Sequence, residues 1–214
     1  MQSPSSSWEA YYRAGSRSIG DYLRSLAAHA PLFDAVIERK PHRILEVGSG
    51  TGIMAIFLSW LGYEVVSIDN DRGVLADAEA LTRALHGSCR YQTADAFRLA
   101  ESFGDASFDV AFSQGFFEHF SDEDIHALVA QQLAVSRTVL ISVPSFYYRV
   151  RDFGNERLLL QRDWRNILDR FPLKSITGYH PRLRGIKSLL KDCAAPWRLV
   201  PWRQTEHWLI RIGQ

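Results

Sequence analysis

The sequence predicts an α/β fold in which helices cover both faces of one mostly parallel, doubly wound sheet. Short apolar runs of the kind that form buried strands recur along the chain, and helical patterns separate them. The first run, Ile44 to Val47, is followed at once by a glycine turn and a helix start. The 214 residues, 46% of them hydrophobic, suit one sizeable domain.

Strands and helices are predicted to alternate from residue 41 onwards. The helix after the first strand covers Ile53 to Leu61, and Pro144 ends the fifth strand. The last run alternates polar and apolar residues, which is typical of a half-buried strand. We expect strands at 44–47, 64–68, 89–93, 107–113, 138–143, 173–179 and 207–212, and helices at 53–61, 73–85, from a cap at Ser121 onwards, and at 158–171.

The first 40 residues precede the sheet and are predicted to be helical. Residues 1–7 should be disordered, a helix begins at Trp8, and Gly15 interrupts it. Further helices are expected at 19–28 and 32–39, the last of which stops before Pro41.

Composition excludes several classes of protein. The net charge of +1 gives no support to a nucleic-acid binder. The two cysteines, Cys89 and Cys193, have no metal-site or disulfide spacing. The first residues do not resemble a signal peptide, and no apolar run approaches the length of a membrane span, so we expect a cytoplasmic protein that binds no membrane.

The glycine turn points to a nucleoside-containing cofactor. Gly48, Gly50 and Gly52 stand at alternate positions between a strand and a helix, where backbone approaches a ligand closely. The dinucleotide fingerprint G-x-G-x-x-G fails, because Ile53 holds the place of its third glycine. Glu46 inside the strand would repel a pyrophosphate but would suit a cationic ligand. S-adenosylmethionine is such a ligand, since it carries a sulfonium and an ammonium and no phosphate.

Two acids follow later strands at positions that suit the rest of a nucleoside. Asp69 ends the second strand some twenty residues beyond Gly48, where a carboxylate can accept from both ribose hydroxyls. The alternative role of a helix cap is better filled by Asp71. Asp95 follows the third strand and is either an acceptor for an exocyclic amine or a solvated loop acid.

The run E-V-G-S-G-T-G at 46–52 resembles the first motif of class I S-adenosylmethionine-dependent methyltransferases of the small-molecule type. The F-D-V-A run at 108–111 is similar to a second family pattern. This resemblance covers roughly residues 40–145. It implies a seven-stranded, Rossmann-like sheet with an antiparallel C-terminal strand, an N-terminal helical lid over 1–40, and a cofactor-binding domain over 41–214. The cofactor-binding residues it implies are Glu46, Gly48, Ser49, Gly50, Gly52, Asp69, Asn70, Asp95, Ala96 and Gln114.

His119 is the candidate catalytic base, since it follows the fourth strand and an unperturbed imidazole titrates near neutral pH. Its alternative role is to anchor the helix start. The Glu118-His119 pair also resembles the metal-holding pair of ubiquinone-pathway O-methyltransferases. Gly115 stands where those enzymes carry another glutamate, so we expect no metal.

Aromatic residues are the candidate pocket walls for the methyl acceptor, although the same rings could simply pack helices onto the body. Substrate-facing segments are expected around 145–160 and 180–203. The second of these is locally basic and either steers an anionic substrate or is a solvated face. The predicted substrate-binding residues are Tyr11, Tyr12, Phe117, Tyr147 and Tyr148.

The sequence therefore predicts methyl transfer from S-adenosylmethionine to an O or N atom of a small molecule, by a monomer or homodimer. Three rivals remain at this point: a nucleic-acid or protein methyltransferase, an NAD-linked oxidoreductase, and a non-catalytic cofactor-binding protein. The S-Q-G-F run at 113–116 differs from the D/N-P-P-Y motif of enzymes that methylate DNA amino groups.

Overall fold

The computed structural model describes residues 8–14, 17–148, 153–183 and 203–213. Residues 1–7, which we predicted to be disordered, the interruption at Gly15, and most of the basic segment lie outside the described residues. Within the described part of the chain, no helix combines the length and apolar character needed to cross a bilayer.

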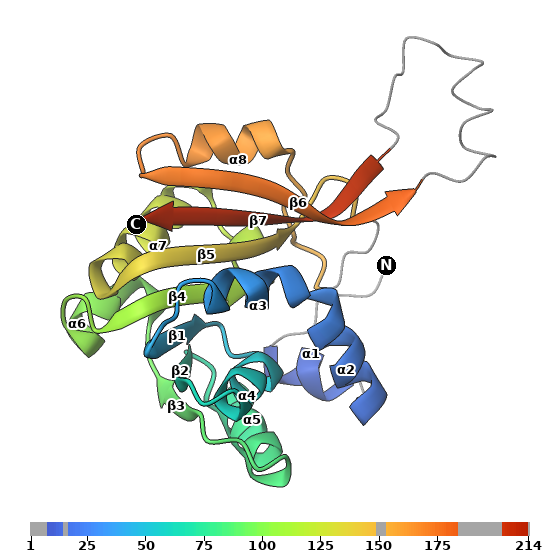
Figure 1. Ribbon diagram of the computed structural model, residues 1–214, viewed down its shortest axis with the longest axis vertical. Coiled ribbons are helices and arrows are strands. Elements are labelled where there is room, and N and C mark those ends of the chain that lie inside the picture. Colours follow the sequence, from blue (N-terminus) through green and yellow to red (C-terminus); the bar gives the residue numbers. More distant parts are fainter. Residues whose placement is uncertain (1–7, 15–16, 149–152, 184–202, 214) are drawn as a thin grey trace.

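One seven-stranded sheet with the order β3-β2-β1-β4-β5-β7-β6 forms the centre of the molecule (Figure 1). Its first five strands, β1 to β5 in sequence, pair in parallel. β7 runs antiparallel to both β5 and β6. The strands cover Arg43–Val47 (β1), Glu64–Asp69 (β2), Arg90–Thr93 (β3), Phe108–Gln114 (β4), Ser136–Pro144 (β5), Leu173–Leu183 (β6) and Arg203–Gly213 (β7). The predicted fold class is confirmed.

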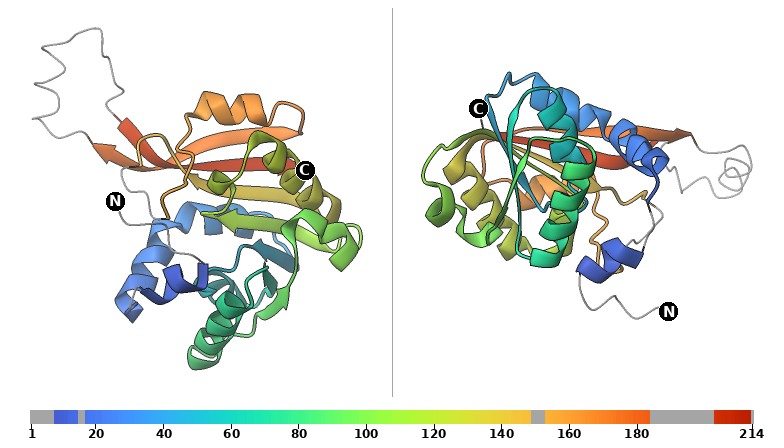
Figure 2. Two further views of the ribbon diagram at one scale, coloured as in Figure 1. Left: turned by 180° about the vertical axis from the view of Figure 1, so that it is seen from behind. Right: turned by 90° about the horizontal axis from the view of Figure 1, so that it is seen from below.

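Helices lie on both faces of the sheet (Figure 2). β5 shows why both faces need cover, because Leu140 packs toward one helical layer and its neighbours Val139 and Ile141 toward the other. The first layer contains α3 (Ala30–Ile37), α4 (Ile53–Trp60) and α5 (Arg72–Ala84), and the second contains α6 (Leu99–Phe103), α7 (Asp122–Val135) and α8 (Gln161–Ile167).

Local chemistry sets the helix starts near the site. The Asp71 carboxylate accepts from the backbone N–H groups of Gly73 (2.9 Å) and Val74 (3.3 Å), which confirms it as the cap of α5. Ser121 caps α7 in the same way by accepting from Asp124 N at 3.2 Å. Helix α2 covers Ile19–Ala28 as predicted, and a reciprocal capping box between Ser18 and Asp21 begins it.

Several predicted bounds were wrong. Helix α8 is shorter than the predicted 158–171 because Leu160 is extended and its N–H donates to Asp163 Oδ2 at 3.0 Å, so the helix begins only at Gln161. β6 and β7 are longer than expected because they pair with each other out to Leu183 and Arg203. The five-residue helix α6 was not predicted, since it is too short to show a hydrophobic period.

The first helix, α1 (Trp8–Ala14), packs against α5. The Arg13 guanidinium donates to both carboxylate oxygens of Asp77, at 2.7 and 3.0 Å. The backbone N–H of Glu9 donates to Asp71 Oδ2 at 3.3 Å. These contacts hold α1 beside the turn that follows β1.

Candidate functional site

The glycine turn between β1 and α4 is tied to the end of β2. The backbone N–H groups of Gly48 and Ser49 both donate to Ile68 O at 3.0 Å. Gly50 and Gly52 have φ angles of +50° and +75°, a region that favours glycine. A Cβ on Gly50 would lie 2.9 Å from the Tyr12 hydroxyl. Backbone here is therefore exposed to whatever lies between the turn and α1.

Gly52 has a different environment from Gly50. A Cβ on Gly52 would run into the Tyr91 hydroxyl and lie 2.9 Å from the Cβ of Ala78. Gly52 is not among the described residues that line the cavities of this site. It allows α4, α5 and β3 to pack closely, and the structure does not bring it to the predicted cofactor surface.

A cavity of about 280 Å³ opens at the carboxyl ends of β1, β2 and β4, where parallel sheets bind their ligands. The strand ends contribute polar groups, and α1, the segment after β4 and the segment after residue 152 contribute rings. Its described lining consists of Trp8, Tyr12, Val47, Gly48, Gly50, Ile68, Asp69, Asn70, Ala94, Asp95, Ala96, Phe97, Gln114, Gly115, Phe116, His119, Phe120, Phe153 and Asn155.

Asp69 lies on the wall of this cavity at the end of β2, as the sequence predicts. One of its oxygens, Oδ1, accepts from Asp71 N at 3.0 Å. Burial raises the pKa of Asp69 above its ordinary value, while hydrogen bonds from nearby backbone N–H groups act in the opposite direction. Asn70 lies beside it on the same cavity wall and is exposed.

Asp95 precedes a short 3₁₀ helix, η1 (Ala96–Arg98), and follows β3, which pairs with β2 beside Asp69. Its Oδ1 accepts from Phe97 N at 2.9 Å, so the side chain acts as a local cap and is otherwise exposed. Ala96 and Phe97 line the cavity beside it. This wall places an acceptor-only carboxylate and a flat apolar surface together, a combination that suits an aminated heterocycle.

A second cavity of about 190 Å³ joins the first at the glycine turn, where Tyr12, Gly48, Gly50 and Gln114 line both. Two short polar residues of this turn, Ser49 and Thr51, also line it. Gln114 ends β4 and lines both spaces, and its contact with the cofactor stays a prediction.

Glu46 lies at the base of this second cavity and is only 3% exposed. The Ser67 hydroxyl donates to Glu46 Oε2 at 2.5 Å, and Ser49 and Ser67 share a hydrogen bond of 2.7 Å. Burial raises the pKa of Glu46 to about 8, although the Ser67 hydrogen bond lowers it and the Asp69 charge adds to the rise. Burial therefore shifts this group toward its protonated form, while its predicted contact with a cationic ligand stays a prediction.

Arg17 also lines the second cavity and was not predicted from the sequence. Its guanidinium carbon lies 5.2 Å from the centre of the Tyr12 ring. It makes no ion pair with any residue in the part of the chain that the structure describes. A cation and an acid thus line the same space beside the glycine turn.

His119 ends a 3₁₀ turn, η2 (Phe117–His119), and lines the main cavity. Its Nδ1 lies 2.6 Å from Asn155 Oδ1. The Trp8 ring contacts the imidazole edge-on, with 4.9 Å between ring centres, and stacks on Phe153 at 3.9 Å. The sequence analysis missed Trp8, Phe153 and Asn155 as wall residues, because only tertiary packing brings them to His119.

The predicted substrate-binding residues do not all reach the cavities. Tyr12 lines both, and Tyr11 contacts it edge-on at 5.2 Å but is not among the described lining. Phe117 is fully buried against β5 and α7, whereas Phe116 and Phe120 line the main cavity in its place.

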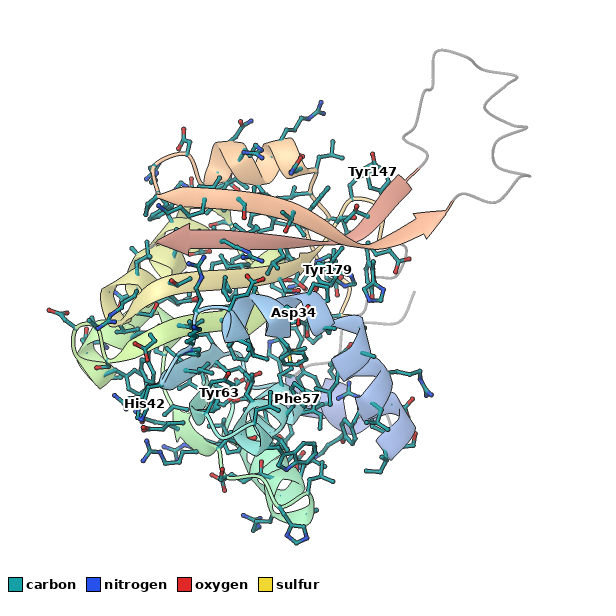
Figure 3. The ribbon with its side chains drawn as sticks, in the orientation of Figure 1. Asp34, His42, Phe57, Tyr63, Tyr147 and Tyr179 are labelled. Atoms are coloured by element: carbon teal, nitrogen blue, oxygen red, sulfur yellow. The ribbon has the colours of Figure 1, made fainter. Side chains whose placement is uncertain are left out.

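Tyr147 and Tyr148 lie beside the β6–β7 hairpin, where Figure 3 labels Tyr147. The Tyr148 ring packs 5.1 Å from that of His207, and Tyr147 N donates to Ser145 Oγ at 3.0 Å. Neither is among the described residues lining the two cavities. Within the described residues, no group of three or more His, Cys, Asp or Glu is placed to hold a metal ion.

The joined cavities fit an elongated ligand with a nucleoside at one end and an amino acid at the other. The nucleoside end would meet Asp69 and Asp95, and the amino-acid end would meet Glu46 and Arg17. The glycine turn lies between them, and Gly50 lets Tyr12 pack closely over it. The residues present therefore suit S-adenosylmethionine.

Residues 44–138 match the family model described as a methyltransferase domain. That range contains the glycine turn, Asp69, Asp95 and His119. No curated protein sequence matches the chain significantly.

Solved structures share the whole fold at low sequence identity. A SAM-dependent methyltransferase from Archaeoglobus fulgidus is 16% identical with a TM-score of 0.67, over 97% of this chain and 98% of the other. One from Mesorhizobium loti is 17% identical with a TM-score of 0.59, over 87% and 98%. Magnesium protoporphyrin IX methyltransferase from Synechocystis PCC 6803, with bound SAH, is 12% identical with a TM-score of 0.63, over 97% and 92%.

Proposed function

We propose that the chain is a class I S-adenosylmethionine-dependent methyltransferase that methylates an oxygen or nitrogen atom of a small, ring-bearing molecule. The observation that carries this proposal is the aromatic wall of the main cavity beside His119. Trp8, Phe120 and Phe153 supply flat apolar surface there, and His119 and Asn155 supply polar atoms at its edge. Because the same cavity of about 280 Å³ also takes the nucleoside end of the cofactor, the acceptor group that enters it has to be small.

In this proposal the cofactor lies across the glycine turn with its two ends in the two cavities. Asp69 accepts from the ribose hydroxyls, and Asp95 with Ala96 meets the adenine edge. Glu46 accepts the ammonium, while the Arg17 guanidinium binds the carboxylate of the amino-acid end. The bound donor supplies an electrophilic methyl group, whose bond to sulfur breaks as its bond to the acceptor forms.

The chain's own part in catalysis is to position the acceptor in a dry space and to take up its proton. The rings in the cavity lining exclude water and orient a flat acceptor. His119 can accept the proton of a hydroxyl, which must leave before or during attack. Helix α1 acts as a lid in this proposal, since Trp8 and Tyr12 form walls of the occupied space.

The main cavity has no Lys or Arg among its described lining residues, while Asp69 and Asp95 give it negative charge. This favours a neutral or cationic acceptor over an anionic one. The basic stretch within 180–203, part of our proposed substrate-facing surface, lies mostly outside the described residues.

Calorimetry with SAH, followed by a methyl-transfer screen, tests the proposal. The purified chain should bind SAH in the calorimeter. When it is given S-adenosylmethionine and phenolic or amine-bearing ring compounds, it should produce SAH by methyl transfer. Short DNA, RNA and a histone-tail peptide form the comparison panel. Turnover of a polymer substrate with none of a small molecule would overturn the acceptor class, and failure to bind SAH would overturn the site.

A further inference from the structure

The segment that carries Asn155 is fastened to the turn that carries His119. Arg157 N donates to the backbone oxygen of Glu118 at 2.8 Å. Its guanidinium donates to Phe120 O and to Asp122 Oδ1, each at 2.6 Å. Three hydrogen bonds from one residue therefore bracket His119 on both sides in the sequence.

The same segment is also tied internally. Glu156 is only 6% exposed, and its carboxylate accepts from the backbone N–H groups of Phe153 and Gly154. Gly154 has a φ angle of +106°, which a residue with a side chain would rarely adopt. The position of Asn155 between Gly154 and Glu156 is thus set by the tight turn and by the contacts of Arg157.

The hydrogen bond between His119 and Asn155 has a defined donor and a defined acceptor. Asn155 Oδ1 is an amide oxygen, which accepts hydrogen bonds and cannot donate them. At 2.6 Å from it, Nδ1 of His119 must carry the hydrogen. A neutral imidazole has only one N–H, so its other nitrogen, Nε2, is the proton acceptor. The edge-on contact with Trp8 limits rotation of the ring.

We propose that Asn155 is a positioning residue that holds His119 in the Nδ1–H tautomer, so that Nε2 takes the proton of a hydroxyl acceptor. The inference rests on the proposed function and narrows its acceptor to a hydroxyl. The O–H bond of the acceptor breaks, an Nε2–H bond forms, and the hydroxyl electrons go into the new bond to the methyl carbon. The resulting imidazolium keeps its Nδ1–H bond to Asn155, which then becomes charge-assisted.

Nitrogen NMR of the histidine side chains reads this tautomer directly, without any acceptor. The full chain, labelled with ¹⁵N-histidine, is measured at pH 8, and His119→Gln identifies the His119 signals. The wild type should show the Nδ1–H tautomer. Asn155→Leu should move most of the population to Nε2–H. An Nε2–H signal in the wild type, or an unchanged tautomer in Asn155→Leu, would overturn the inference.

Asn155→Asp is the matched rescue, because a carboxylate also accepts from Nδ1–H. It should keep the wild-type tautomer and raise the pKa of His119, followed in the same spectra. If Asn155→Leu does not fold, Asn155→Asp still tests the proposal, because loss of the Nδ1–H signal of His119 in Asn155→Asp would contradict it. His126, whose Nε2 lies 2.7 Å from Ile167 O, reports the fold and should not change.

Once an acceptor is known, turnover gives a second readout. Asn155→Leu should lower kcat about tenfold or more while KM changes little. Asn155→Asp should keep kcat near the wild-type value and shift the acidic limb of the pH profile to higher pH. Equal kcat in the wild type and Asn155→Leu would contradict the positioning role. SAH affinity should stay constant in every variant. If the wild type binds no SAH, the proposed function is wrong. The NMR result on the His119 tautomer would be unaffected by that outcome.

Discussion

The hydroxyl of Tyr12 lies directly over Gly50, so that a Cβ on this glycine would approach it to 2.9 Å. The first helix and the turn after the first strand therefore enclose one space from opposite sides. Burial raises the pKa of the Tyr12 phenol, with the neighbouring Tyr11 and Asp69 adding to the rise. The phenol thus stays neutral and can serve as a hydrogen-bond donor beside the bound cofactor.

Asp69→Asn should weaken SAH binding by about 10- to 100-fold, because a neutral amide replaces the charged acceptor for the ribose hydroxyls. The amide oxygen can still accept from Asp71 N, so the start of α5 is kept. Calorimetry measures the change. Asp105→Asn is the control, since Asp105 is exposed and is not among the described cavity residues. Equal affinity in Asp69→Asn and the wild type would refute the ribose role.

Arg17→Gln should weaken binding of SAH about tenfold or more and leave 5′-methylthioadenosine unaffected, because the latter lacks the carboxylate. Calorimetry with both ligands separates a lost charge contact from a displaced lid, which would weaken both. Arg24→Gln provides the comparison, since Arg24 is 75% exposed and pairs with Asp21 at 2.5 Å. A similar loss for both nucleosides would rule out the carboxylate contact.

Glu46→Gln should remove a pH dependence from folding stability. Burial raises the pKa of Glu46 to about 8, so between its ordinary value of 4.5 and pH 8 the folded chain holds a proton that the unfolded chain releases. The stability contributed by this group is therefore fully present below pH 4.5, falls as pH rises from there toward 8, and is lost above 8. Urea unfolding at pH 5.5 and 7.5 should show the wild type losing about 2 kcal/mol relative to the variant.

Two histidines contribute a pH dependence of the opposite sign, and the comparison between the wild type and Glu46→Gln cancels their contribution. Burial lowers the pKa of His29 to about 3 and that of His207 to about 4, so both favour the folded state more as pH rises toward 6.5. They are present in both proteins and drop out of the difference. A difference that stays constant between the two pH values would mean that Glu46 is ionised in the folded chain.

Gly52→Ala should destabilise the fold by more than Gly62→Ala. Both glycines have positive φ angles, +75° and +89°, so both substitutions introduce backbone strain of about 1 kcal/mol. A Cβ at Gly62 meets nothing within 4 Å, whereas at Gly52 it would meet Tyr91 and Ala78. The excess measured for Gly52→Ala by chemical unfolding should be about 1–3 kcal/mol. Equal losses would show that the close packing at Gly52 relaxes freely.

His119→Gln should lower turnover by about 10²- to 10⁴-fold with SAH affinity unchanged, because the base is lost and the cofactor walls are not. Release of SAH measures turnover. Acceptors with acidic hydroxyls, already ionised at the assay pH, should lose much less, since they need no base. An equal loss for acidic and ordinary hydroxyls would assign His119 a purely structural role.

Much of the fold could be predicted because its strands are short apolar runs ended by glycine, proline or an acid. The cap at Asp71 and the role of Pro144 at the end of β5 follow from local chemistry. Helix α6 gave no such signal, because five residues are fewer than two turns.

The candidate site was predictable where it follows strand ends and unpredictable where packing builds it. Asp69 and Gln114 end parallel strands and so had to lie on one edge of the sheet. Arg17, Phe153 and Asn155 reach that edge only through the packing of distant segments. Among Phe116, Phe117 and Phe120, local pattern could not tell which ring faces the core, because the turn there is not a regular helix.

The strand order also places the two reactants in separate parts of the chain. Groups suited to the donor come mainly from β1, β2, β4 and the turns after them, whereas Trp8 of α1 and the 153–157 segment add groups suited to the acceptor beside His119. Neither of these two segments belongs to the sheet (Figure 1). Retuning which compound is methylated can therefore be sought in the 153–157 segment and at Trp8, whereas Tyr12 of the same helix, which lines both cavities, should be kept for the donor.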